Sequence, residues 1–178
     1  MSETNLITDI DNKYWFVLYT KPRQEFKAAI QLEAGQIEYY MPVITRLSKW
    51  SDRHKKIKEP LLKSYIFVKG KERERVAAVE LPSIVRSVYY CGRPAKIHDY
   101  EIENLKFFVK EGHDYIVQEG LIKGTAVKIN NGPFKDVTGI VVNDLKKRRI
   151  AVSIELLNRT VIAYFSNQYE IEILKEVI

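Results

Sequence analysis

The pattern of hydrophobic residues along this chain changes near residue 112. Before that point, apolar runs of strand length alternate with segments that repeat apolar residues every three to four positions, which is typical of alternating strands and helices. After it, only short β-branched runs separated by turn residues remain, which indicates strands alone. Two hydrophobic cores fit a chain of 178 residues. We therefore expect an N-terminal tail over residues 1–12, a first domain over 13–112, a linker over 113–123 and a second domain over 124–178.

The first domain is expected to be α+β, of the ferredoxin-like type, with helices packed on a mainly antiparallel sheet. Its strands are expected in the aromatic and β-branched runs Tyr14–Tyr19, Ile37–Met41, Lys63–Lys69 and Ile84–Tyr90. Residues Val43–Ile57 are expected to form an extended hairpin that leaves this domain.

Three helices are expected beside these strands. The first has Pro22 in its first turn and ends near Gly35, with Phe26, Ala29 and Ile30 on one face. The second covers Glu72–Val79. The third is capped by Asp99 and stops at Gly112, and its apolar stripe consists of Ile102, Leu105, Phe108 and Val109.

The second domain is expected to be a small SH3-like β-barrel. Turn residues such as Asn131-Gly132-Pro133 separate its short runs. The polar stretch around His113–Lys123 is expected to be a connector without regular structure. Five strands are expected, at Ala126–Ile129, Val137–Asn143, Arg149–Leu156, Thr160–Phe165 and Glu170–Ile173.

The net charge of +6 comes entirely from residues 1–110, which hold 20 basic and 14 acidic residues, whereas residues 111–178 hold nine of each. Positive charge is densest in Arg46–Lys58, with six Lys and Arg, one acid and Trp50. This stretch is either a phosphate-binding arm or simply the solvated tip of a hairpin.

Several classes of function find no support in the sequence. No nucleophile, base and acid come together in a catalytic pattern, so we do not expect an enzyme or a cofactor. The three histidines and the single Cys91 are too far apart for a metal site, and Cys91 is expected to be a buried or half-buried thiol. The N-terminus lacks the basic start of a signal peptide, and no apolar run is long enough to span a membrane. We expect a cytoplasmic monomer.

Two parts of the sequence resemble the NusG family of transcription elongation factors. In the second domain, Gly124–Val141 is similar to the KOW motif. In the first domain, five blocks follow in the order of the family: Tyr14–Tyr19, Lys21–Glu25, Tyr40–Pro42, Pro60–Val68 and Gly92–Ala95. The stretch Trp50–Arg53 and the compact length are closer to the specialised paralogues, the RfaH-like and UpxY-like antiterminators of capsule operons, than to the housekeeping factor.

The resemblance implies a contact between the first domain and the clamp helices of the RNA polymerase β′ subunit. Aromatic side chains on strands suit such a contact, because they offer a large area at little entropic cost. Without the resemblance, several of them would simply be core residues. Where the family usually has an aromatic-proline pair, this chain has Leu62-Lys63. The implied polymerase-binding residues are Tyr19, Leu62, Tyr65, Phe67, Tyr90, Pro94 and Ile97.

The specialised paralogues also touch the displaced non-template DNA strand. Exposed Lys and Arg bind phosphates without reading sequence, and they serve equally well as solubility residues. The implied nucleic-acid-binding residues are Lys21, Arg23, Lys27, Trp50, Arg53, Lys55, Lys56, Arg73 and Arg75.

For the second domain, the resemblance implies a contact with a ribosomal protein or with the Rho termination factor. In RfaH-like proteins this domain can instead fold as a helical hairpin. The Val and Ile alternation and the interrupting Gly and Pro residues favour strands here, although Asn143–Asn158 is compatible with either state. The alternative function is that of a ribosome-associated or RNA-binding KOW protein. The position of the excess positive charge, which lies outside the barrel, argues against this alternative.

Overall fold

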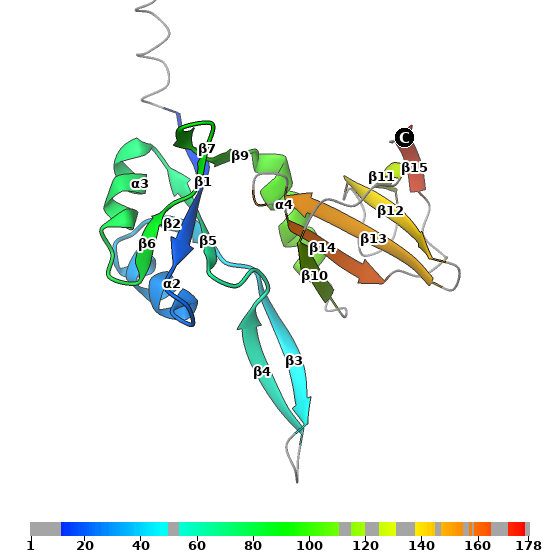
Figure 1. The fold of residues 1–178 in the computed structure, drawn as a ribbon, viewed down its shortest axis with the longest axis horizontal. Coiled ribbons are helices and arrows are strands. Elements are labelled where there is room, and N and C mark those ends of the chain that lie inside the picture. The colour runs from blue at the N-terminus through cyan, green and yellow to red at the C-terminus, as the bar shows by residue number, and fades with distance from the viewer. Residues whose placement is uncertain are drawn as a thin grey trace, which may run out of the picture. The chain divides into compact units, whose positions relative to one another are not determined.

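The computed structural model describes residues 12–49, 54–110, 115–119, 125–130, 138–144, 147–154, 157, 159–164 and 171–176. In this part of the chain it has three helices and several antiparallel sheets, a mixed α/β architecture (Figure 1). The chain divides into two compact units, residues 1–43 with 58–99 and residues 44–57 with 100–178.

The first unit is built on an antiparallel sheet with the strand order β2-β5-β1-β6, and β9 also pairs with β1. The central pair, β1 and β5, runs in register from Tyr14 opposite Gly70 to Tyr19 opposite Tyr65. Both strands were expected, since aromatic and β-branched side chains fit a pleated sheet that is packed on both faces. The elements are β1 (Tyr14–Thr20), α2 (Glu25–Ala34), β2 (Glu38–Tyr40), β5 (Tyr65–Gly70), α3 (Glu72–Val79), β6 (Ile84–Ser87), β7 (Tyr89–Tyr90), β8 (Arg93–Pro94) and β9 (Lys96–Ile97).

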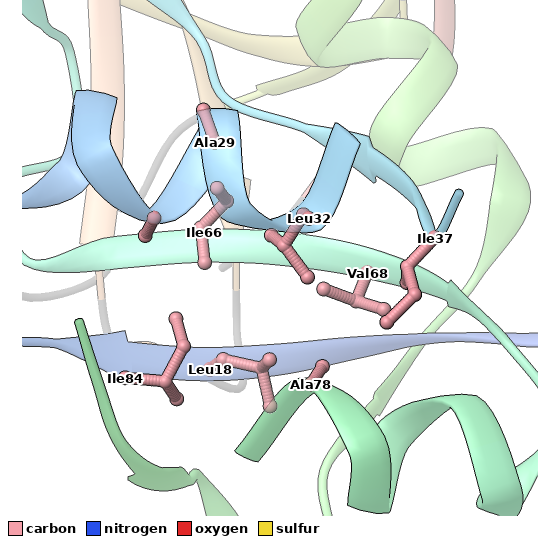
Figure 2. Close-up of a cluster of buried hydrophobic side chains, with 9 residues drawn as sticks. Leu18, Ala29, Leu32, Ile37, Ile66, Val68, Ala78 and Ile84 are labelled. Carbon is pink, nitrogen blue, oxygen red and sulfur yellow. The ribbon is translucent and has the colours of Figure 1, made fainter. Parts of the chain in front are cut away.

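One face of this sheet carries α2 and α3, and the hydrophobic core lies between them (Figure 2). Alternate residues of a strand point to the same face, so Leu18 of β1 and Ile66 and Val68 of β5 all face the helices. The small Ala28, Ala29 and Ala78 let the helix backbones come close to the sheet. The remaining members of the cluster are Leu32, Ile37 and Ile84.

The position of α2 differs from expectation. The helix begins at Glu25, because Arg23 takes a left-handed conformation with a φ of 62° and the residues from Lys21 to Gln24 form a turn. The buried face consists of Glu25, Ala28, Ala29 and Leu32. Phe26 and Ile30 are exposed, so the expected apolar face was wrong at these two positions.

The hairpin expected between the second and third large strands is present as β3 (Val43–Lys49) paired with β4 (His54–Pro60). The last helix, α4, covers Asp99–Lys110 and buries Ile102, Leu105 and Phe108, which confirms most of the predicted stripe.

The second unit contains an antiparallel sheet in the order β10-β14-β13-β12-β11-β15. Five of its strands lie where the sequence predicted them, and within Asn143–Asn158 the residues 143–144 and 147–154 are strand rather than helix. The bounds are β10 (Tyr115–Glu119), β11 (Thr125–Ile129), β12 (Thr138–Asp144), β13 (Lys147–Ile154), β14 (Arg159–Tyr164) and β15 (Ile171–Glu176).

Strand β10 was not predicted, because it lies in the stretch expected to be a connector. Its residues pair with β14, from Tyr115 opposite Ala163 to Glu119 opposite Arg159. The short run Tyr-Ile-Val has strand propensity, but the polar residues around it hid the signal. The segment becomes a strand because β14 offers it an open edge to pair with.

Candidate partner-binding surface

The face of the first sheet that points away from α2 and α3 is lined by aromatic side chains in three rows. The register of β1 and β5 places Tyr19 opposite Tyr65, Val17 opposite Phe67 and Trp15 opposite Lys69. Alternation puts all six on one face, since their neighbours Leu18, Ile66 and Val68 belong to the helix-covered core. The strand pattern therefore groups the predicted aromatic residues as expected.

Burial along this face is uneven. Trp15, Val17 and Phe67 are buried, with Phe67 0% exposed, whereas Lys69 opposite Trp15 is half-exposed. The Phe67 ring stacks on that of Tyr40 in β2, with 6.2 Å between the ring centroids. Phe67 is thus a core residue of the folded chain.

The row formed by Tyr19 and Tyr65 is half-exposed. The two rings meet edge to face, with 5.4 Å between centroids and an interplanar angle of 75°. The Arg86 guanidinium of β6 lies over the Tyr19 ring, 5.9 Å from its centroid. This end of the sheet face, which we call the tyrosine end and define by Tyr19, Tyr65 and Arg86, offers aromatic surface together with a positive charge.

A buried carboxylate holds the loop that leads to the tyrosine end. Oε1 of Glu25, at the start of α2, accepts a hydrogen bond from the Ser64 backbone N–H at 2.8 Å. Ser64 has a φ of 64°, and its carbonyl accepts from the Thr20 N–H at 2.9 Å. This role could not be predicted from the sequence, because Glu25 looks like an ordinary first-turn acid.

The hairpin of β7 and β8 projects from the edge strand β6. Tyr89 lies opposite Pro94 and Tyr90 opposite Arg93, so the turn consists of Cys91 and Gly92. Their φ angles of 49° and 76° are both positive, as a type I′ turn requires. Cys91 is exposed, and the expectation of a buried thiol was wrong because a tight turn points its side chains into solvent.

The predicted polymerase-binding residues therefore fall into two groups. Tyr19 and Tyr65 are half-exposed, Tyr90 is 62% exposed and Pro94 is half-buried. Leu62, Phe67 and Ile97 are buried in the folded chain, so they serve packing and we drop them from the candidate contact.

The predicted nucleic-acid-binding residues are also divided. Those that are exposed are Lys21, Arg23 and Lys27 at and near the start of α2, Lys55 and Lys56 on β4, and Arg73, which pairs with Glu74 at 3.2 Å. Trp50 and Arg53 lie outside the described residues.

Arg75 corrects the sequence-based expectation. Arg75 is only 8% exposed, and its guanidinium donates hydrogen bonds to the Glu72 carboxylate and to the Ser87 hydroxyl. The hydrogen bond with Glu72 raises the pKa of Arg75. An arginine that turns inward in this way is not available to a phosphate, so we remove it from the nucleic-acid-binding set.

Among the described residues, no group of three or more His, Cys, Asp or Glu side chains is arranged to hold a metal ion. None of the described helices combines the length and apolarity needed to cross a membrane.

The fold and this surface define an α/β protein with an aromatic sheet face opposite its helices and with exposed basic residues in the turn and helix that follow β1. A comparison with protein families matches residues 13–106 to the family described as "Transcription termination factor nusG". The chain therefore belongs to the NusG family of transcription factors. A search of curated proteins found no match.

Two solved structures were also similar. One is described as "Domain interaction in Thermotoga maritima NusG", with 21% identity, a TM-score of 0.48, and coverage of 92% of this chain and 98% of that one. The other is the MjSpt4:Spt5 complex in conformation B, with 20% identity, a TM-score of 0.31, and coverage of 91% and 97%.

Proposed function

We propose that this NusG family protein is an elongation and antitermination factor that binds the clamp helices of the RNA polymerase β′ subunit through its first unit. The observation that carries the proposal is the half-exposed Tyr19–Tyr65 pair at the end of a sheet face whose other aromatic residues on β1 and β5, Trp15 and Phe67, are buried. Aromatic anchors of this kind dominate the energy of many protein interfaces. The tyrosine end and Tyr90 are the proposed contact.

The polymerase contact is tested by replacing Tyr19 and Tyr65 with serine and measuring capture of core RNA polymerase. Anchors of this type are commonly worth about 2 kcal/mol or more each, so capture by the folded double variant should be largely lost. A matched control is Tyr39→Ser, because Tyr39 is also a half-buried tyrosine of this sheet but packs against the helix-covered core. Capture at the wild-type level by the Tyr19/Tyr65 variant would refute the proposal.

We further propose that the exposed basic residues near α2 and on β4 bind the phosphates of the displaced non-template DNA strand. Each phosphate contact should steepen the dependence of log K on log salt by roughly 0.7 to 0.9. Replacing Lys55 and Lys56 with glutamine should flatten that slope. Replacing Lys21 and Lys27 with glutamine is a second test, with the same expected result. Salt-independent binding would contradict this contact.

The specialised paralogue assignment, and with it service to a capsule or other polysaccharide operon, remains a proposal that rests on the Trp50–Arg53 stretch and the compact length. We propose that the second unit is a KOW barrel that recruits a ribosomal protein or Rho. The strand order of its sheet supports this assignment, because β15, the last strand expected for the barrel, pairs with β11, the first strand expected for it.

A further inference from the structure

Arg75 of α3 is the centre of a buried polar network in the first unit. Its Nε donates to Glu72 Oε2 at 2.8 Å, and a second nitrogen bonds Glu72 Oε1, so the guanidinium and the carboxylate form a two-point pair. A third nitrogen donates to the Ser87 hydroxyl at 2.6 Å. The guanidinium also lies 5.9 Å from the centre of the Phe16 ring. Three residues from three elements, Glu72, Ser87 and Phe16, thus share one cation.

The position of Ser87 connects this network to the β7–β8 hairpin. Ser87 ends β6, and the next residue, Val88, is the base of the β7–β8 hairpin. The Val88 N–H donates to the Val17 carbonyl of β1 at 2.9 Å, and the Val88 carbonyl accepts from the Ala95 N–H at 2.8 Å. Arg75 therefore holds the chain at the point where the hairpin leaves the sheet.

The hairpin has two different faces. Directly opposite residues of a paired ribbon lie on the same face, so Tyr89 and Pro94 share one face and Tyr90 and Arg93 share the other. Tyr89 and Tyr90 are both exposed, at 53% and 62%, and Arg93 is exposed as well. Pro94 on the Tyr89 face is half-buried, so Tyr90 and Arg93 form the more open face of the hairpin.

We infer that Arg75 is a positioning residue that fixes the β7–β8 hairpin so that Tyr90 and Arg93 can dock on a helical protein surface bearing carboxylates. This inference rests on the proposed function, in which that surface belongs to the polymerase clamp. A short ribbon held only by its own turn would sample many orientations, and each would reduce the population that is competent to bind. The base of this ribbon is bonded to β1 through Val88 and β9, and the bond from Arg75 to Ser87 adds a side-chain anchor that further restricts its orientation.

The neighbouring Arg73 supplies a matched control. It lies on the same helix, but its side chain is 91% exposed and pairs with Glu74 on the surface. The variants Arg75→Met and Arg73→Met thus remove the same charge, and only the first removes the link to Ser87.

The first measurement is amide hydrogen exchange in the full chain, with the Ala95 amide as the reporter of the hairpin base. Rates are normalised to amides of the β1–β5 pair, so that general destabilisation cancels. In Arg75→Met we expect the Ala95 amide to exchange about tenfold faster, the effect of losing one well-made buried hydrogen bond. In Arg73→Met it should not change. An unchanged ratio in Arg75→Met overturns the inference.

The second measurement is the affinity for core RNA polymerase in the absence of DNA and RNA, so that a phosphate contact of Arg73 does not contribute. Arg75→Met should weaken binding about tenfold, and Arg73→Met should leave it within about twofold. Faster Ala95 exchange with unchanged affinity would also overturn the inference. If the wild-type protein does not bind polymerase at all, the proposed function fails instead, and the exchange rates alone decide whether Arg75 orients the hairpin.

Should Arg75→Met fail to fold, Ser87→Ala takes its place. This variant keeps the Arg75–Glu72 pair and removes only the hydroxyl that links it to β6. The same direction of change is expected in both measurements, with about threefold faster exchange at Ala95. An unchanged exchange ratio in this variant overturns the inference.

Discussion

The rings of Tyr19 and Tyr65 lie directly opposite each other on neighbouring strands and meet edge to face at 5.4 Å. A pair with this geometry is worth about 0.5 to 1.5 kcal/mol beyond the area it buries. We therefore expect a double-mutant cycle of Tyr19→Leu and Tyr65→Leu, measured by urea unfolding, to give a coupling energy in that range. Strict additivity of the two substitutions would show that the rings do not interact in solution.

Glu25 should be important for stability despite its place in the first turn of a helix. Its carboxylate is the acceptor for the Ser64 amide, and an unsatisfied buried N–H costs about 1 to 3 kcal/mol. Glu25→Ala should lower the free energy of unfolding by about that amount. Glu25→Gln keeps an oxygen at the same position and should cost less. Equal losses in the two variants would mean that the hydrogen bond is not what matters at this site.

The pair of Glu72 and Arg75 predicts a specific dependence of stability on pH. The hydrogen bond from Arg75 lowers the pKa of Glu72 from its ordinary value of 4.5. A carboxyl whose pKa is lowered on folding stabilises the native state above the unfolded pKa, and it loses that contribution as the pH falls through the native pKa. The difference in melting temperature between wild type and Glu72→Gln should thus be full at pH 7 and disappear in acid below pH 4.5. In an Arg75→Met background, Glu72→Gln should show little such pH dependence.

The hairpin turn is not optimal for its geometry. Both turn residues have positive φ, and asparagine tolerates that conformation better than cysteine. Cys91→Asn should therefore stabilise the protein by about 0.5 kcal/mol. Gly92→Ala should destabilise it by about 1 kcal/mol, since an added Cβ meets no atom within 4 Å and only the backbone conformation resists it. Melting temperatures check both changes, and a loss of stability in Cys91→Asn would contradict the turn assignment.

The strands and helices of the first unit were predictable because their patterns are local. The aromatic and β-branched composition of the β1 and β5 runs indicates strands, and both ends of α3 were predicted correctly. Which side of a helix or strand is buried depends on tertiary packing, and the prediction of the buried face of α2 was wrong. Phe26 and Ile30 look like core residues but are exposed, since the small Ala28 and Ala29 fit closer to the sheet.

The candidate site was predictable only as a set of residue types. Tyr65 and Phe67 share a face, as alternation requires, but they differ in burial. Tyr65 lies at the open end of the sheet face, whereas Phe67 lies farther along the strand, where the face is covered. Arg75 was misplaced for a similar reason. Its neighbours Glu72 and Ser87 are three and twelve residues away, and only the fold shows that the guanidinium meets the second of them.

The unpredicted strand β10 bears on where the second unit can be cut from the chain. A fragment beginning at residue 124 would lack β10 and leave β14 unpaired along one side, from Arg159 to Ala163. This strand carries the buried Val161 and Ile162, and an uncovered strand of that kind invites pairing with another molecule. Truncation at residue 124 should therefore produce self-association that a start before Tyr115 avoids.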